Sequence, residues 1–162
     1  MTRAHQFLRY GFASAAVLVF AALQVSGTFS FFGIVPNLAL SMLIALLFYF
    51  SSFAEVLLLS ALAVFVLNWE RGLSWELVAF LFALPTAFLA KRLMPWHFML
   101  ETAILVFLAF GIFAFLADPA YPLLFPVRFG VEFLYAEASA FFSLALLALW
   151  YGAPQERDLS RM

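Results

Sequence analysis

Long apolar runs, broken at intervals by small clusters of polar residues, follow one another along almost the whole chain. No Asp, Glu, Lys, Arg or His occurs between Arg9 and Glu55, a stretch far longer than the roughly 20 apolar residues that cross a bilayer once. Gly27, Gly33 and Pro36 lie within this stretch and are typical of chain breaks. The pattern therefore predicts two consecutive membrane spans here.

Similar breaks divide the rest of the chain. Ser51 and Ser52 predict a tight turn, Glu70–Gly72 predicts a polar turn, and Pro95 separates two further helices. A loop is expected at Asp118–Pro126. The pattern predicts an all-α integral membrane protein, a single transmembrane domain over residues 1–162 that forms a bundle of six transmembrane helices. The predicted spans are about 8–26, 36–50, 53–68, 74–90, 97–117 and 128–151.

The composition supports this class of protein. Hydrophobic residues make up 67% of the 162 residues, charged residues make up 10%, and the mean hydropathy is +1.09. A soluble core of this size could not hide so much apolar surface. Each tryptophan flanks an apolar run, as expected for indole rings at a membrane–water boundary. The four are Trp69, Trp75, Trp96 and Trp150.

The first apolar run has two interpretations. Arg3 and Arg9 precede it and small residues follow near Ser26 and Gly27, an arrangement that also occurs in cleaved signal peptides. We favour a retained first span, because everything downstream is predicted to be embedded in the membrane as well.

The basic residues predict the orientation of the bundle. With six spans and a cytoplasmic N-terminus, Arg71 and Arg128 fall outside and the other basic residues fall inside. Those inside are Arg3, Arg9, Lys91, Arg92, Arg157 and Arg161. This asymmetry is the positive-inside bias of membrane proteins, and it predicts that both termini are cytoplasmic.

Composition also argues against several kinds of chemistry. A formal net charge of −1 provides no basic field for nucleic acid, and the absence of Cys excludes disulfides and thiolate metal sites. His5 and His97 are far apart in the sequence, which argues against a histidine metal site. No nucleophile or phosphate-binding glycine loop accompanies the carboxylates, so we expect no cofactor and no enzymatic activity.

The carboxylates of Glu101, Glu132 and Glu137 fall inside the predicted spans. A charged group at the centre of a membrane helix costs at least about 2.5–3.5 kcal/mol, so each should have a partner or a function. For Glu101 and Glu132, as for Glu55, we favour a carboxylate that reaches the nearest interface. Glu137 is the deepest, and three roles stay open: pairing with Arg128, donating as a neutral acid to another helix, or lining a cavity.

Ala79, Ala83 and Ala87 form a stripe of small residues at four-residue spacing in the fourth span. Small residues allow helix backbones to approach closely, so this face is predicted to pack against another helix, either of this chain or of a partner. The 23 phenylalanines are expected to face lipid or to fill the core.

The second and third spans carry the most specific pattern in the chain. Pro36-Asn37-Leu38 follows the apolar lead-in Phe32–Val35, and the second span continues through Leu40–Leu46 to Tyr49 and the tight turn. Asn68 ends the third span and Gly72–Ser74 follows it. This arrangement resembles the MreD family of the bacterial cell-elongation machinery. In that family a Pro-Asp/Asn-Leu element opens the second span, Asp often ends the third, and a glycine-rich turn follows.

The resemblance implies a non-enzymatic scaffold in the bacterial inner (cytoplasmic) membrane, a rod shape-determining protein with roles in cell shape and peptidoglycan synthesis. It would contact membrane lipids, bind an MreC-like single-span protein and other cell-elongation proteins, and help couple cytoskeletal MreB filaments to wall synthesis. Pro36, Asn37 and Asn68 would specify the fold or contact a partner, because an asparagine in lipid usually bonds another helix. The third span differs from the family in carrying Ser60, Ala61 and Ala63 where glycines are usual.

Two other functions would use parts of the same pattern. A substrate-binding S component of an energy-coupling-factor vitamin transporter would use Glu132, Glu137 and the Asp118–Pro126 loop as an outward-facing ligand pocket. Such a subunit is expected to carry an Ala-x-x-x-Ala pair in its first span, and the alanines there lack that spacing. A lipid-modifying enzyme would need clustered polar residues near one interface. Lys91, Arg92 and His97 are clustered, but a topogenic, headgroup-binding role explains them more simply.

Overall fold

The computed structural model describes residues 3–30, 33–68, 75–94, 97–152 and 154, without the side chains of residues 3–6 and 75–76. All the regular elements within these residues are helices, which confirms the all-α class. They are α1 (Arg3–Ser26), α2 (Leu38–Leu46), α3 (Phe53–Leu67), α4 (Trp75–Leu93), α5 (Phe98–Ala117), α6 (Tyr121–Leu124) and α7 (Pro126–Tyr151). Trp69, Arg71, Trp96, Arg157 and Arg161 lie outside the described residues.

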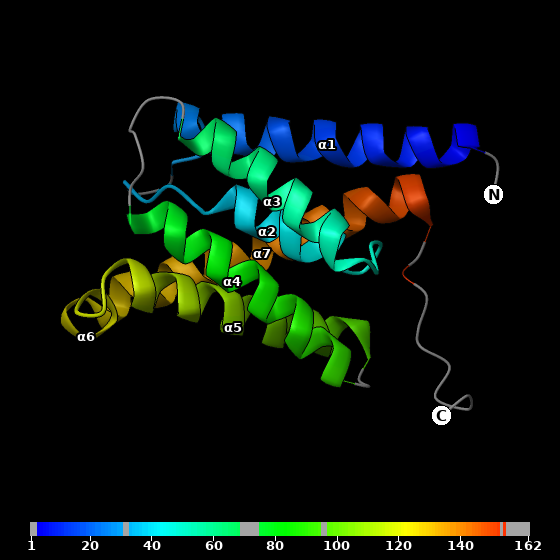
Figure 1. Cartoon of the computed structure of the whole chain (residues 1–162). Coiled ribbons are helices and arrows are strands. Elements are labelled where there is room, and N and C mark those ends of the chain that lie inside the picture. Colours follow the sequence, from blue (N-terminus) through cyan, green and yellow to red (C-terminus); the bar gives the residue numbers. More distant parts are fainter. Residues whose placement is uncertain (1–2, 31–32, 69–74, 95–96, 153, 155–162) are drawn as a thin grey trace.

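The shortest of the six main helices lies at the centre of the bundle. All nine residues of α2 are buried, and α2 contacts α1, α3, α4, α5 and α7 (Figure 1). The outer helices pack in sequence, with α1 against α3, α3 against α4, α4 against α5, and α5 against α7. Because α2 is surrounded by protein, its apolar side chains form the core rather than a lipid-facing surface.

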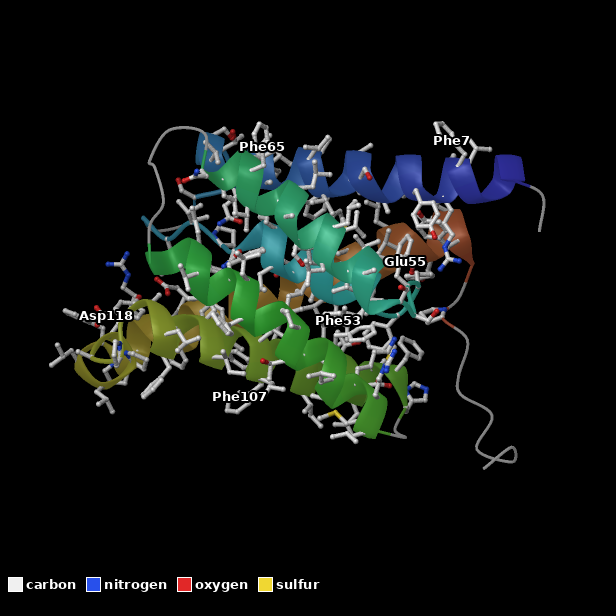
Figure 2. All side chains as sticks on the ribbon, viewed as in Figure 1. Phe7, Phe53, Glu55, Phe65, Phe107 and Asp118 are labelled. Carbon is white, nitrogen blue, oxygen red and sulfur yellow. The ribbon has the colours of Figure 1, made fainter. Side chains whose placement is uncertain are left out.

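The six main helices run alternately up and down, which gives the bundle two distinct ends. At one end, which we call the basic end, the start of α1 meets the α2–α3 turn and the last turns of α4 and α7. There Tyr10 hydrogen-bonds Glu55, and the Tyr151 hydroxyl donates to the Arg9 carbonyl oxygen at 2.6 Å. The α6 end is opposite: Asp118 lies there, far from Glu55 (Figure 2).

The second helix is shorter than the predicted span 36–50. Asn37 is its N-cap, since the side-chain Oδ1 accepts a hydrogen bond from the Leu40 amide at 3.2 Å, so the helix begins at Leu38. Pro36 therefore precedes the helix instead of occupying its first turn. After Leu46 the chain turns through residues 47–49 and reaches Ser51 without further helix. At 1.5 Å per residue, nine residues cover only about 14 Å of a hydrocarbon core about 30 Å thick.

The other predicted boundaries need smaller corrections. The segment Asp118–Pro126, predicted to be a loop, contains the single helical turn α6. Helix α4 does not end before Lys91 but includes Lys91 and Arg92 in its last turn. Ser52 and His97 are the N-caps of α3 and α5, at the breaks that the sequence predicts. The break at Ser51–Ser52 and the start of the fifth span were therefore located well, the break at Lys91–Arg92 was placed too early, and the predicted breaks at Glu70–Gly72 and Pro95 lie outside the described residues.

Within the described part of the chain, three helices are long and apolar enough to cross a membrane, over Phe7–Ser26, Phe98–Ala117 and Pro126–Tyr151. Helix α3 is apolar but shorter. Large apolar side chains are exposed on the outside of the bundle, among them Phe65, Phe107 and Phe142. Phe107 projects away from the other helices (Figure 2). Apolar exposure of this kind suits a lipid solvent and supports a membrane protein.

Candidate functional site

The most concentrated polar network inside the bundle surrounds the start of α2. Gln24 of α1 accepts a hydrogen bond from the Ala39 amide through Oε1, at 3.0 Å, and Asn37 caps the Leu40 amide. Two of the amide groups that a helix start leaves without intrahelical partners are thus bonded to side chains. Asn37 is buried, with 8% of its surface exposed, so a lost bond here would not be replaced easily by water.

Ser41 links this network to α7. Its hydroxyl lies 3.0 Å from the carbonyl oxygen of Asn37 and 3.0 Å from that of Ala136, which is 95 residues away in the sequence. Ser41 is buried and sits one helical turn after the N-cap. The sequence alone does not single out Ser41 as a site residue. A lone hydroxyl in an apolar span signals some hydrogen bond, but the usual acceptor is its own helix.

Glu101 is buried in the first turn of α5, with 7% of its surface exposed. Thr102 beside it is fully buried, and its hydroxyl donates to the Phe98 carbonyl oxygen at 2.6 Å. The position favours a carboxylate because the first turn of a helix carries a partial positive charge. Glu101 is therefore enclosed among the helices at the basic end of the bundle.

Glu132 belongs to a small network at the α6 end. Its Oε1 accepts hydrogen bonds from the Tyr121 hydroxyl at 2.6 Å and from Arg128 Nε at 3.3 Å. Burial, followed by the hydrogen bond to the Glu132 carboxylate, raises the pKa of Tyr121 to about 12. Arg128 thus pairs with Glu132, one turn away, and not with Glu137.

Glu137 and Asn68 each bury an oxygen that lacks a hydrogen-bond partner among the described residues: Oε2 of Glu137 and Oδ1 of Asn68. Glu137 is only half-buried as a whole and follows Ala136, whose carbonyl binds Ser41. Asn68 is the C-cap of α3. A buried acceptor without a donor is costly, so both positions are candidates for contacts beyond these helices.

The alanine stripe lies inside the bundle. Ala79, Ala83 and Ala87 are at most 1% exposed, and α4 packs most extensively against α5. Their small side chains allow this close approach. The surface they form is occupied by helices of the same chain.

Three cations converge on the α2–α3 turn at the basic end. Lys91 donates to the Leu47 carbonyl oxygen, and its ammonium lies 4.4 Å from the centre of the Phe48 ring. The Arg9 guanidinium lies 4.6 Å from the centre of the Phe50 ring. In both positions the cation is attracted to the negatively polarised face of the aromatic ring, which is a cation–π interaction.

The third cation, Arg92, lies over the Phe88 ring at 4.8 Å, and its Nη2 is 3.4 Å from the Ser51 carbonyl oxygen. The sequence pointed to Lys91 and Arg92 as a cluster, but not to Arg9 or to the rings. Arg9 is 82 residues from Lys91, so only the fold could bring them to one turn.

Chemically, these networks connect helices and expose charge at one end. Within the described residues, no group of three or more His, Asp or Glu side chains is arranged to hold a metal ion. Comparisons with protein-family models, curated proteins and solved structures found no match to the chain.

Proposed function

We propose that this protein is a six-span scaffold of the bacterial inner membrane, similar in role to MreD, with both termini cytoplasmic. Two features support the topology. The alternating helices return the start of α1 and the end of α7 to the same end of the bundle. Of the four basic side chains that the structure describes, Arg9, Lys91 and Arg92 lie at that end and Arg128 lies at the other. This distribution is the one that the positive-inside rule assigns to a cytoplasmic face.

The observation that carries the scaffold proposal is the place of Pro36-Asn37-Leu38 in the fold. This element, on which the resemblance to MreD rests, opens the one helix that contacts all the other main helices. Asn37 caps that helix, and Ser41 in its first turn bonds α7. A residue pattern that organises the centre of a bundle suits a protein whose role is to present a defined helical surface to partners.

The proposed partners are an MreC-like single-span protein and other proteins of the cell-elongation machinery, with membrane lipids around them. Their contacts would lie on the exposed apolar faces of the outer helices, because α2 and the alanine stripe are enclosed within this chain. The role requires no cofactor and no catalysis.

Affinity purification from native membranes in mild detergent, followed by mass spectrometry, tests the proposal. We expect the tagged chain to retain a single-span coiled-coil protein together with wall-synthesis enzymes. Recovery of paired ATPases, or of a stoichiometric small molecule, would overturn it in favour of the S component of a vitamin transporter.

A pair of variants at Asn37 sharpens this test. Asn37→Leu removes the cap and leaves the buried Leu40 amide without its partner, at a cost of about 1–3 kcal/mol of stability. Asn37→Asp keeps an acceptor at the same place and matches the Asp that the MreD element also allows. We expect Asn37→Leu to lower both the unfolding temperature and partner recovery, and Asn37→Asp to preserve both. Equal partner recovery with both variants would contradict the proposed link between this element and assembly.

A further inference from the structure

The α2–α3 turn at the basic end is surrounded by fixed positive charge. Arg9 comes from α1, whereas Lys91 and Arg92 come from the end of α4. The acidic residue on this turn, Glu55, is bound by the Tyr10 hydroxyl and by the Ser52 amide, the latter at 3.3 Å. With the buried Glu101 at the start of α5, two carboxylates stand against three cations at this end, so positive charge is still in excess.

The three cations do not have the same role. Lys91 is half-buried and bonds the Leu47 carbonyl, so it stabilises the end of α2. Arg92 is exposed, and Ser51 and Ser52 beside it are exposed as well. Arg9 is half-exposed on the other side of Phe50. Two guanidinium groups and two hydroxyl groups are thus accessible around a single turn, a donor set that suits a phosphate group.

Apolar surface adjoins this donor set. Leu89 and Leu93, close to Arg92 on α4, are 55% and 84% exposed, and Phe53 at the start of α3 is 42% exposed. The rings of Phe53 and Phe88 are 5.7 Å apart, so α3 and α4 meet directly below the charged turn. A ligand with a phosphate at one end and hydrocarbon at the other would match both parts.

We propose that Arg9, Arg92 and the Ser51–Ser52 turn bind the phosphate of an anionic phospholipid, with its acyl chains along Phe53, Leu89 and Leu93. The charge favours an anionic headgroup, and the adjoining apolar side chains favour a lipid over a soluble phosphate. This site depends on the membrane embedding of the basic end, but not on the scaffold role.

Native mass spectrometry of the delipidated protein in detergent tests the site, with phosphatidylglycerol or phosphatidylcholine added back. The test variant is the double substitution Arg9→Gln and Arg92→Gln. The matched control is Arg128→Gln, which removes an exposed arginine at the α6 end. Binding in detergent does not depend on the direction of insertion, so an effect of these charges on topology cannot produce the result.

We expect wild type and Arg128→Gln to bind phosphatidylglycerol in preference to phosphatidylcholine. The double variant should bind phosphatidylglycerol roughly 25-fold more weakly, since each basic residue near an anionic surface contributes roughly fivefold. Arg92→Lys retains the charge and should keep most of the binding. If the double variant does not fold, Arg92→Gln alone should show the fivefold loss.

Two outcomes would overturn the proposal. One is equal binding of phosphatidylglycerol by wild type and the double variant, which would leave the cations available to an acidic protein partner. The other is complete displacement of the lipid by an equal concentration of inorganic phosphate, which would identify a soluble phosphate as the ligand. Either result leaves the affinity-purification test of the scaffold unaffected, so the two proposals fail separately.

Discussion

The two ends of the bundle are held together in different ways. At the basic end, hydrogen bonds join distant parts of the chain: Tyr151 to Arg9 across 142 residues, and Tyr49 to Gly152 across 103. Around α6, the described hydrogen bonds join residues at most 11 positions apart, as between Tyr121 and Glu132. The first arrangement ties different helices into one unit, whereas the second closes a local turn.

This difference has a consequence for stability. A bond between distant segments exists only when the whole bundle is assembled, so its loss lowers the stability of the fold. A bond within a turn can persist when the helices separate, and its loss affects mainly that turn. The basic end should therefore be the more sensitive to substitution, although both ends contain charged and aromatic residues.

Substitution of Lys91 should give the largest loss of stability, and so the clearest difference between the two ends. Lys91→Met leaves the Leu47 carbonyl at the end of α2 without its charged donor, and we expect a loss of about 2 kcal/mol in the free energy of unfolding. Arg128→Met removes an exposed pair with Glu132 and should cost less than about 0.5 kcal/mol. Reversible unfolding in SDS, followed by circular dichroism, measures both. Equal losses of unfolding free energy for the two variants would contradict the view that the basic end is the more sensitive to substitution.

A smaller effect is expected for tyrosine hydroxyls. Tyr151→Phe removes the bond to the Arg9 carbonyl between the last and first helices, and should cost about 1 kcal/mol. Tyr121→Phe leaves Glu132 bonded to Arg128 and open to water, so the loss should stay within about 0.5 kcal/mol. The same unfolding assay compares them. A larger loss for Tyr121→Phe would show that α6 is a global support of the bundle.

The last prediction concerns the alkaline range and the α6 end alone. The pKa of Tyr121 in the folded protein, about 12, lies above the ordinary value of 10.0, so the neutral phenol is favoured by folding. This contribution is present below pH 10 and is lost as the pH rises from 10 through 12. The difference in phenolate absorbance between wild type and Tyr121→Phe reports the titration. Glu132→Gln should lower the pKa without returning it to 10, because burial is the larger cause.

The division of the chain into helices could be predicted because its signals are local. Ser51 and Ser52 interrupt an apolar run, and α3 begins directly after them, at Phe53. His97 marks the start of α5 in the same way. Each break depends on a few adjacent residues that cannot remain in an apolar helix at low cost, so no knowledge of the fold is needed to find it.

The candidate sites could be predicted only in part, because their partners are distant in the sequence. Ser41 looks unremarkable until α7 brings the Ala136 carbonyl to it. The end of α2 likewise involves a distant residue, since Lys91 binds the Leu47 carbonyl in the turn that follows this helix. Periodicity could not distinguish this enclosed helix from an ordinary span, since both are continuously apolar.

The short, enclosed α2 also constrains the order in which this protein can be made. About nine helical residues are too few to cross a bilayer alone, so in the proposed topology α2 would enter together with α3 as a hairpin. Its lasting neighbour α7 is synthesised some 90 residues later, and until then the hydroxyl of Ser41 has no Ala136 carbonyl to bind. The centre of the bundle is therefore completed only when α7 arrives, after α1, α3, α4 and α5 have been made.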